Sequence, residues 1–197
     1  MPQETAIKKL RNDVANRLKG GITIVVLGAS GDLAKKKTFP ALFSLYKDGF
    51  LPEKTEIVGY ARSDLDIQEY HKRVTANLEA EDDESKKKVD EFIKLCHYVK
   101  GKYDEDDSFK NLDKYISESE DKRGLKGDQK NRMFYMALPP SVYVQVSQGL
   151  HKFVRSKEGH NALVIEKPFG KDSESACELL NEIKKLFSEE EVMINVY

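Results

Sequence analysis

Residues 22–34 read ITIVVLGASGDLA, an apolar run that gives way to a turn containing glycine. Every residue of Ile22–Leu27 is apolar or β-branched, which predicts a strand buried on both faces. Gly28 and Gly31 then bracket a tight turn, and a helical pattern begins at about Asp32. Glycine lets a phosphate approach backbone N–H groups, and a helix N-terminus adds unpaired donors. The segment therefore predicts a nucleotide-binding corner. A purely structural turn is the alternative, because Gly-x-x-Gly departs from the common G-x-G-x-x-G spacing.

Length and composition predict one globular domain of ordinary size. The chain has 197 residues, of which 39% are hydrophobic and 34% charged, with a net charge of −1. A nucleic-acid-binding domain usually carries a strong basic excess, so we expect no nucleic-acid partner. No apolar run approaches the roughly 18 residues that span a bilayer, so we expect no membrane partner.

Cysteine usage and the N-terminal segment bear on localisation. Cys96 and Cys177 fit no pairing or metal-ligand pattern, so we expect two free thiols, no metal and a cytoplasmic protein. Residues 1–20 mix basic residues with Glu4 and Asp13 and lack a long apolar core. They predict an N-terminal arm, either a short amphipathic helix or an unstructured segment, rather than a secretory signal.

Strand patterns alternate with helical patterns along the rest of the chain. Further strands are expected at Glu56–Tyr60, His97–Lys100, Met133–Leu138 and Ala162–Glu166. Helices are expected at Lys35–Lys47, Asp66–Leu78, Glu84–Leu95, Ser108–Ser119, Ser141–Arg155 and Asp172–Phe187. This alternation predicts an α/β fold with a doubly wound parallel sheet.

Four positions within this pattern carry further expectations. Pro40 should kink the first of these helices or lie in its first turn, and Gly49 should cap its C-terminus. Residues 121–131 predict an exposed loop. The pattern of Val192–Tyr197 is compatible with either an added edge strand or a frayed end.

A second motif, Gly59–Ser63 (GYARS), ends the second expected strand. In dinucleotide-binding folds this position meets the adenosine ribose. An acidic residue there suits the 2′-hydroxyl of NAD, whereas an arginine suits the 2′-phosphate of NADP. Arg62 can pair with a phosphate in a bidentate manner, which favours NADP. A solvated surface arginine is the alternative.

Two further motifs follow later strands. Glu166–Gly170 (EKPFG) puts Lys167 at the carboxyl end of a strand, where open α/β sheets bind ligands. The bond between Lys167 and Pro168 is a candidate cis peptide, and a turn with a surface lysine is the alternative. Ala137–Pro140 (ALPP) predicts either a packing wall beside a nicotinamide or a simple end to the strand.

Together, GASGDLAKKK, GYARS, FYMALPP and EKPFG, in this order and spacing, resemble the glucose-6-phosphate dehydrogenase family of eukaryotic type. The resemblance runs from about Ile22 to about Glu191. It implies an NADP-binding, Rossmann-like domain over residues 21–191, between an arm at 1–20 and a divergent tail at 192–197. Members of this family oxidise the C1 hydroxyl of glucose 6-phosphate and pass hydride to NADP⁺. The product is 6-phosphogluconolactone, and the step opens the pentose phosphate pathway of glucose metabolism.

Carried over by position, the resemblance implies roles for particular residues. Arg62 would hold the 2′-phosphate, and Tyr103, within Gly101–Asp104, would contact the coenzyme. Lys167 would lie between the coenzyme and the sugar phosphate and hydrogen-bond the substrate. The diphosphate loop would consist of Gly28, Ala29, Ser30, Gly31, Asp32, Leu33, Ala34 and Lys35.

The family pattern stops before its sugar-binding motif. In the family, a helix like Asp172–Phe187 leads to R-I-D-H-Y-L-G-K, whose histidine and lysine bind the sugar phosphate. A second histidine, further along, is the general base. Residues 190–197 read EEVMINVY instead. The resemblance therefore implies a chain without the family's C-terminal α+β domain, which carries the base and the interface of its dimers and tetramers.

Two functions remain as alternatives at this point. The histidines of the sequence match no family motif; they are His71, His97, His151 and His160. Because a general base and substrate positioning each contribute orders of magnitude in rate, we expect little or no turnover from this chain alone. The chain is either the coenzyme half of a glucose-6-phosphate dehydrogenase or a catalytically inactive module that binds NADP and regulates a partner.

Overall fold

The protein folds around one parallel sheet of six strands, in the order β3-β2-β1-β4-β5-β6. The structure is a computed structural model, and it describes residues 2–166 and 173–195. The strands are β1 Gly21–Leu27, β2 Lys54–Ala61, β3 Cys96–Lys100, β4 Arg132–Met136, β5 Asn161–Glu166 and β6 Val192–Asn195. The chain builds outward from β1 to β3 and then from β4 to β6, so the sheet is doubly wound, as predicted. The strand order reverses between β1 and β4, and ligands bind beside such a point at the carboxyl ends of the strands.

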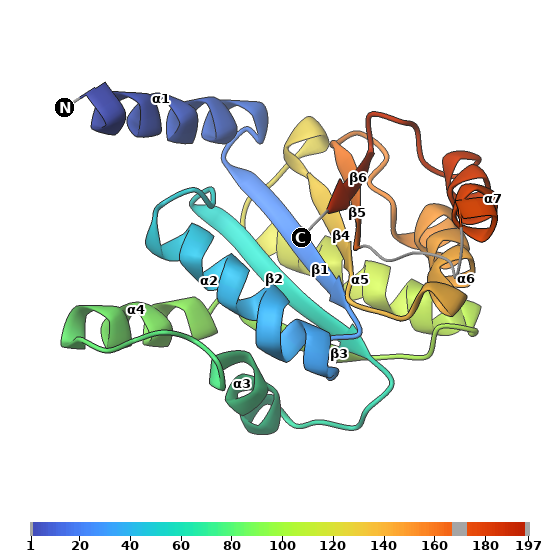
Figure 1. The fold of residues 1–197 in the computed structure, drawn as a ribbon, viewed down its shortest axis with the longest axis horizontal. Coiled ribbons are helices and arrows are strands. Elements are labelled where there is room, and N and C mark those ends of the chain that lie inside the picture. Colours follow the sequence, from blue (N-terminus) through green and yellow to red (C-terminus); the bar gives the residue numbers. More distant parts are fainter. Residues whose placement is uncertain (1, 167–172, 196–197) are drawn as a thin grey trace.

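Helices cover both faces of the sheet (Figure 1). The α-helices of the described residues are α1 Pro2–Arg17, α2 Phe39–Lys47, α3 Ile67–Thr75, α4 Asp83–Ile93, α5 Asp106–Lys122, α6 Tyr143–Gly149 and α7 Ser173–Lys184. Helices α2, α3 and α4 lie on one face, over β1, β2 and β3, whereas α5, α6 and α7 lie on the other. Shorter helical segments are Ala34–Thr38, Gly127–Gln129, Pro140–Val142 and Leu150–Val154.

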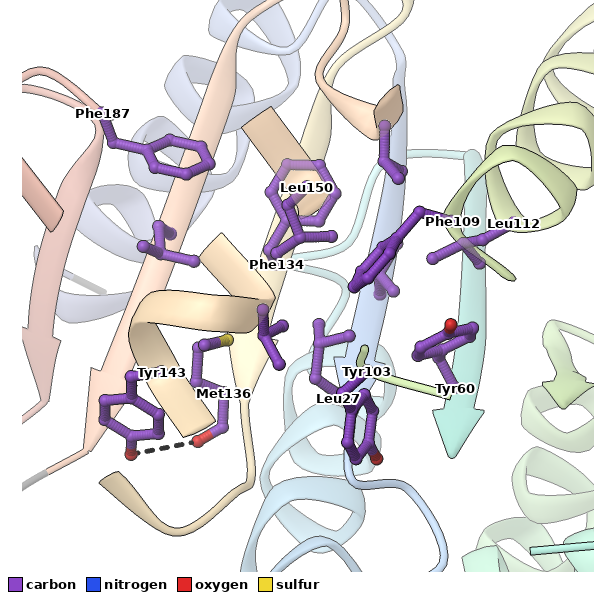
Figure 2. Packing of buried hydrophobic residues seen from close by; sticks show 14 of the residues in the cluster. Leu27, Tyr60, Tyr103, Phe109, Leu112, Phe134, Met136, Tyr143, Leu150 and Phe187 are labelled. Atoms are coloured by element: carbon purple, nitrogen blue, oxygen red, sulfur yellow. Dashed lines mark hydrogen bonds between the residues drawn. The ribbon is translucent and has the colours of Figure 1, made fainter. Parts of the chain in front are cut away.

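Each face of the sheet has its own hydrophobic core. Every residue of β1 is buried, and its side chains alternate between the two cores. Ile24 and Val26 pack with α2, α3 and α4, whereas Val25 and Leu27 pack with α5, α6 and α7. Figure 2 shows the second core, in which residues of the strands meet aromatic and aliphatic residues of the helices. The continuous apolar run of β1 is thus explained by burial on both faces.

The helix after β1 changes its hydrogen-bonding pattern along its length. Residues Ala34–Thr38 form a π-helical segment, and Pro40 lies in the first turn of α2, which follows it directly. Pro40 has no N–H to donate to the preceding turn, and the hydrogen-bonding pattern changes directly before it. Gly49 has a φ of +68°, and its N–H donates to the Tyr46 carbonyl at 2.9 Å. The predicted C-terminal cap at Gly49 is therefore confirmed.

The end of β4 and the exposure of segment 121–131 differ from the sequence-based expectation. β4 ends at Met136 rather than Leu138, because the chain turns at Ala137, whose N–H donates to the Tyr135 carbonyl at 3.1 Å. The segment 121–131 is only partly exposed, so that prediction was wrong in part. Leu125 is 1% exposed, and Asn131 is 2% exposed and donates its amide to the Leu18 and Gly21 carbonyls at 2.8 and 3.0 Å.

Both ends of the described chain form regular secondary structure. The N-terminal arm forms α1, which extends away from the sheet in Figure 1. The run after Glu191 forms β6, which pairs in parallel with β5, so the edge-strand alternative is the one observed. Cys96 is buried and Cys177 exposed, and both are free thiols. Over the described residues, no helix combines the length and apolar character needed to cross a bilayer.

Candidate functional site

The chain turns sharply at Gly28, directly after β1. Gly28 has a φ of +83°, and a Cβ atom at this position would lie 2.2 Å from the Ala137 carbonyl oxygen. The N–H groups of Gly28 and Ala29 donate to the Tyr60 carbonyl at 2.9 and 3.3 Å, and the Gly31 N–H donates to the Gly28 carbonyl at 2.9 Å. The corner between β1 and its helix is therefore fixed by backbone hydrogen bonds and requires glycine at position 28.

The helix that leaves this corner presents its first N–H groups at the carboxyl edge of the sheet. Its first i to i−4 hydrogen bond runs from Lys35 N to the Gly31 carbonyl, at 3.2 Å. The N–H groups of residues 32–34 thus belong to the first turn, which a helix leaves without intrahelical acceptors. Gly31 and Asp32 are exposed at this turn, and the Asp32 carboxylate pairs with Lys36 at 3.2 Å. The corner therefore offers solvent-facing donors at the positive end of a helix dipole.

The residues of the predicted diphosphate loop divide into a packed set and an open set. Gly28, Ala29 and Ala34 are buried, so they shape the corner. Gly31 and Asp32 are exposed, and the half-buried members are Ser30, Leu33 and Lys35. The open set is the part of the loop that a ligand could reach.

The end of β2 lies against this loop. The Ser63 hydroxyl donates to the Ser30 hydroxyl oxygen at 2.9 Å. Arg62, the preceding residue, is exposed, and its guanidinium carbon lies 5.7 Å from the centroid of the Tyr103 ring. The structure thus brings together three parts that the sequence separates: the loop after β1, Arg62 and Tyr103.

Tyr103 follows β3, and its ring packs against the Arg62 guanidinium. Its side chain is 8% exposed, and its ring centroid lies 5.8 Å from that of Tyr60 (Figure 2). Burial raises the pKa of Tyr103, while the charge of Arg62 and the backbone of Gly28 act to lower it. The phenol is therefore neutral at physiological pH and supports the guanidinium through a cation–π contact.

Two contacts at this site involve residues that sequence reasoning missed. Arg73, on α3, donates from Nη1 to the Ser30 carbonyl at 3.1 Å. Tyr98, on β3, donates from its hydroxyl to the Ser63 carbonyl at 2.7 Å. An exposed arginine on an amphipathic helix is ordinary, so the sequence carried no motif for Arg73. Its charge on the helix directly after GYARS was the only available signal.

The charges at this edge are unevenly matched. Among the described residues, neither Arg62 nor Arg73 forms an ion pair, whereas the nearby Asp64 pairs with Lys100 at 2.9 Å. Two exposed guanidinium groups beside free helix N–H donors form an arrangement suited to phosphate groups. Lys167, the other predicted site residue, lies outside the described residues, as does its bond to Pro168.

The motif ALPP lies next to the same corner. Ala137 is 6% exposed, and its carbonyl oxygen fills the space beside Gly28. Pro139 and Pro140 lead into the short helical segment Pro140–Val142. The motif therefore ends β4 and packs against the corner, and its contact with a nicotinamide stays a prediction.

Comparison with known proteins points to one family. A family described as "Glucose-6-phosphate dehydrogenase, NAD binding domain" matches residues 25–195, which is four residues beyond the expected end of the resemblance at Glu191. Glucose-6-phosphate 1-dehydrogenase of Emericella nidulans is 47% identical over 92% of this chain and 35% of its own length. Glucose-6-phosphate 1-dehydrogenase 5, cytoplasmic, of Arabidopsis thaliana is 46% identical over 88% of this chain and 35% of its own length. The chain thus spans about a third of these relatives.

Solved structures agree on the fold. A structure described as glucose-6-phosphate dehydrogenase in complex with its substrate glucose-6-phosphate superimposes with a TM-score of 0.82 at 41% identity. That match covers 89% of this chain and 36% of the other. The glucose-6-phosphate 1-dehydrogenase from Mycobacterium avium superimposes with a TM-score of 0.72 at 24% identity, which supports the fold alone.

Proposed function

This chain belongs to the glucose-6-phosphate dehydrogenase family, matching its NAD binding domain, and on that premise we propose that its carboxyl-edge site binds NADP. One observation carries the choice of coenzyme. The position after β2 is occupied by Arg62, an exposed guanidinium that lies over Tyr103. An arginine at this place favours the 2′-phosphate of NADP over the 2′-hydroxyl of NAD.

The residues present fit a dinucleotide. Gly28 permits the sharp turn, the open part of the loop after β1 exposes N–H donors for the diphosphate, and Arg62 supplies charge for the 2′-phosphate. We propose that Gly28–Lys35, Arg62 and Tyr103 form the coenzyme site, in which Gly28, Ala29 and Ala34 shape the corner and the open residues of the loop meet the ligand. We propose residues 21–191 as the coenzyme-binding domain, with β6 joining it as an edge strand.

The proposed reaction is the one named by the relatives. NADP⁺, when bound, would accept a hydride from the C1 carbon of glucose 6-phosphate as a base removes the hydroxyl proton. Lys167, which follows β5 in the sequence, is proposed to hydrogen-bond the sugar phosphate and to contact the coenzyme. In keeping with the cytoplasmic Arabidopsis relatives, we propose that the reaction takes place in the cytoplasm.

The described histidines favour coenzyme binding without turnover by this chain alone. His71 contacts the Cys96 carbonyl at 2.9 Å, and His97 lies 3.6 Å from Glu56. These contacts are at the amino ends of the strands, and His160 directly precedes β5. His151 packs against Phe187 at a ring-centroid distance of 6.1 Å and lines the same surface pocket as His160. A general base must come within hydrogen-bond reach of the proton it removes, and these imidazoles lie at the opposite edge from the proposed site.

Titration of the full chain with NADP and with NAD tests the coenzyme assignment. We expect NADP to bind tightly enough to quantify by calorimetry and at least ~10-fold more tightly than NAD, since a charge-assisted phosphate contact is absent from NAD. Equal dissociation constants for NADP and NAD would contradict the assignment.

A second measurement separates the enzyme from the binding module. Absorbance at 340 nm reports NADPH formation when the chain is mixed with NADP⁺ and glucose 6-phosphate. We expect binding with little or no turnover. Sustained NADPH production that requires glucose 6-phosphate would instead make this chain an active dehydrogenase.

The Lys167 assignment has its own test. We expect Lys167→Ala to leave the dissociation constant for NADP nearly unchanged and to remove any affinity for glucose 6-phosphate. A loss of NADP affinity as large as that of Arg62→Ala would contradict this role.

A further inference from the structure

We propose that Arg73 is a second specificity residue for the 2′-phosphate, acting with Arg62 to favour NADP over NAD; this rests on the proposed function. The starting observation is that Arg73 reaches from α3 to the loop after β1, where Nη1 donates to the Ser30 carbonyl at 3.1 Å. It thereby joins the helix after GYARS to the proposed phosphate loop.

The fold fixes the position of Arg73 on α3. The helix begins with a capping box, in which the Glu69 N–H donates to the Asp66 carboxylate at 2.8 Å and the Glu69 side chain accepts from the Asp66 N–H. Tyr70 and Val74 are fully buried against the sheet. Because Arg73 lies between these two anchors, its backbone cannot shift without disturbing the core.

Arg73 and Ser63, the neighbour of Arg62, contact Ser30 from different elements. Ser30 accepts from Arg73 through its carbonyl and from Ser63, the neighbour of Arg62, through its hydroxyl. The Tyr98 hydroxyl donates to the Ser63 carbonyl at 2.7 Å, and the charge of Arg73 is close enough to act on the pKa of Tyr98 by lowering it. Because Arg62 directly precedes Ser63, a 2′-phosphate bound at the end of β2 would lie near Ser30 and Ser63, where Arg73 also reaches.

The charge balance explains why two arginines would act on one phosphate. A guanidinium carries five N–H donors, and the contact with the Ser30 carbonyl uses one of them. Among the described residues Arg73 has no carboxylate partner, and Asp64, the acidic residue that follows Ser63, is paired with Lys100. A phosphate monoester has three oxygens and up to two negative charges, so it can accept from two guanidinium groups at once. NAD has a hydroxyl at that position and would gain little from Arg73.

The test is Arg73→Gln in the full chain, with Lys72→Gln as the matched control. Lys72 is the neighbouring exposed residue of α3, so both variants remove one positive charge from the same helix turn. Calorimetric titrations would use NADP, NAD and 2′,5′-ADP at one fixed salt concentration. For Arg73→Gln we expect the dissociation constants of NADP and 2′,5′-ADP to rise ~10-fold, the size of one charge-assisted contact, and that of NAD to change less than ~2-fold. We expect Lys72→Gln to leave all three within ~2-fold.

The outcomes separate this inference from the proposed function. Equal losses for NADP and NAD would overturn it, because they would mean that Arg73 only holds the loop through Ser30. No loss for NADP, with wild-type protein still preferring NADP, would overturn it and leave the proposed function intact. Failure of the wild-type chain to bind NADP would overturn both. Arg73→Lys serves as a second variant: it keeps the charge, so it should retain part of the NADP preference and unfold at the wild-type temperature.

Discussion

The two edges of the sheet both hold arginines, in opposite surroundings. At the amino edge, Arg132 is 5% exposed and donates to Glu120, which is fully buried, at 2.7 Å and to Asp113 at 2.6 Å. At the carboxyl edge, Arg62 and Arg73 are exposed and have no carboxylate partner among the described residues. The same residue type is therefore a structural element at one edge and a candidate ligand-binding element at the other.

At the amino edge, a buried carboxylate is surrounded by donors from the protein itself. Buried Glu56 accepts from the Tyr115 hydroxyl at 3.1 Å, from the Ser119 hydroxyl at 2.5 Å and from Arg123 at 3.2 Å. Each of these side chains interacts with Glu56, although the buried Arg123 Nε has no hydrogen-bond partner among the described residues, so most of the network is committed to protein atoms. The difference between the edges teaches that the partners of an arginine, rather than its presence, indicate a binding role.

Arg132→Met tests the structural role of the amino edge and is expected to have the largest effect on stability. It would leave the Glu120 carboxylate buried and unpaired, so we expect the free energy of unfolding to fall by about 3–5 kcal/mol. Chemical denaturation measures this fall, and NADP titration of the protein that stays folded should give an unchanged dissociation constant. Arg132→Met combined with Glu120→Leu should recover much of the loss. A stable single variant would show that the buried pair is dispensable.

Alanine substitutions at Gly28 and Gly49, two glycines with positive φ, compare the two edges of the sheet. At Gly28 the added Cβ would meet the Ala137 carbonyl at 2.2 Å, whereas at Gly49 the nearest atoms belong to Arg11, 3.8 Å away. We expect Gly49→Ala to cost about 1–2 kcal/mol of stability, the penalty for a left-handed conformation, and to leave NADP binding unchanged. Gly28→Ala should cost about 1–3 kcal/mol through backbone strain, with the steric clash added, and should also weaken NADP binding by more than ~10-fold. Thermal unfolding and titration of both variants check this, and equal effects would argue against a special corner.

Arg62→Ala tests the carboxyl edge directly. Loss of a charge-assisted contact of about 1.5–3 kcal/mol should raise the dissociation constant for NADP roughly 10- to 100-fold and that for NAD less than ~3-fold. Stability should change by no more than about 0.5 kcal/mol, because Arg62 is exposed. Parallel titrations decide the matter, and a similar loss for both coenzymes would remove Arg62 from the 2′-phosphate assignment.

Alkaline pH is expected to have the smallest effect on stability, and it acts through individual tyrosines at the two edges of the sheet. Burial raises the pKa of Tyr98 to about 12, and burial together with the nearby charge of Glu56 also raises the pKa of Tyr115. A phenol with a raised pKa in the folded state contributes its full stability below about pH 10, its unfolded pKa, and loses it as the pH rises toward the folded value. Melting temperatures should therefore decline between about pH 10 and 12.

Tyr98→Phe and Tyr115→Phe should each make that decline shallower. Tyr115→Phe should also lower the melting temperature at pH 7, because buried Glu56 loses a donor. Tyr98 is at the edge with exposed groups, so Tyr98→Phe should cost less at pH 7. Calorimetric scans from pH 7 to 12 would show whether the phenols account for the slope, and an unchanged slope in both variants would exclude them.

The fold was largely predictable because β1, β2 and β5 are buried on both faces. Apolar runs such as Ile22–Leu27 admit few other interpretations, and the expected strands β1 to β5 are confirmed with shifts of at most two residues at their ends. β6 stayed undecided because its run is short and its pairing partner, β5, is distant in sequence. Exposure of 121–131 was overestimated, since the burial of Leu125 beside Gly21 depends on a contact across the fold.

The site was predictable to the extent that it follows local motifs. The loop after β1 and Arg62 lie in GASGDLA and GYARS, and the structure brings them together with Tyr103. Arg73 was missed because its contact with Ser30 spans 43 residues and depends on how α3 docks. The buried Glu56 and Arg132 were missed for a related reason: charged residues usually indicate a solvated surface, and only the tertiary structure supplies their partners.

The exposure of Arg62 and Arg73 also has a kinetic consequence. Within the part of the chain that the structure describes, neither of these two cations has a carboxylate partner, so together they produce a local positive potential, even though the whole chain has a net charge of only −1. Such a potential draws an anionic molecule toward the edge before contact, within a screening length of about 8 Å at physiological salt. The encounter rate with the coenzyme should therefore slow as ionic strength rises, while the buried pairs at the opposite edge, shielded from counterions, hold the sheet together unchanged.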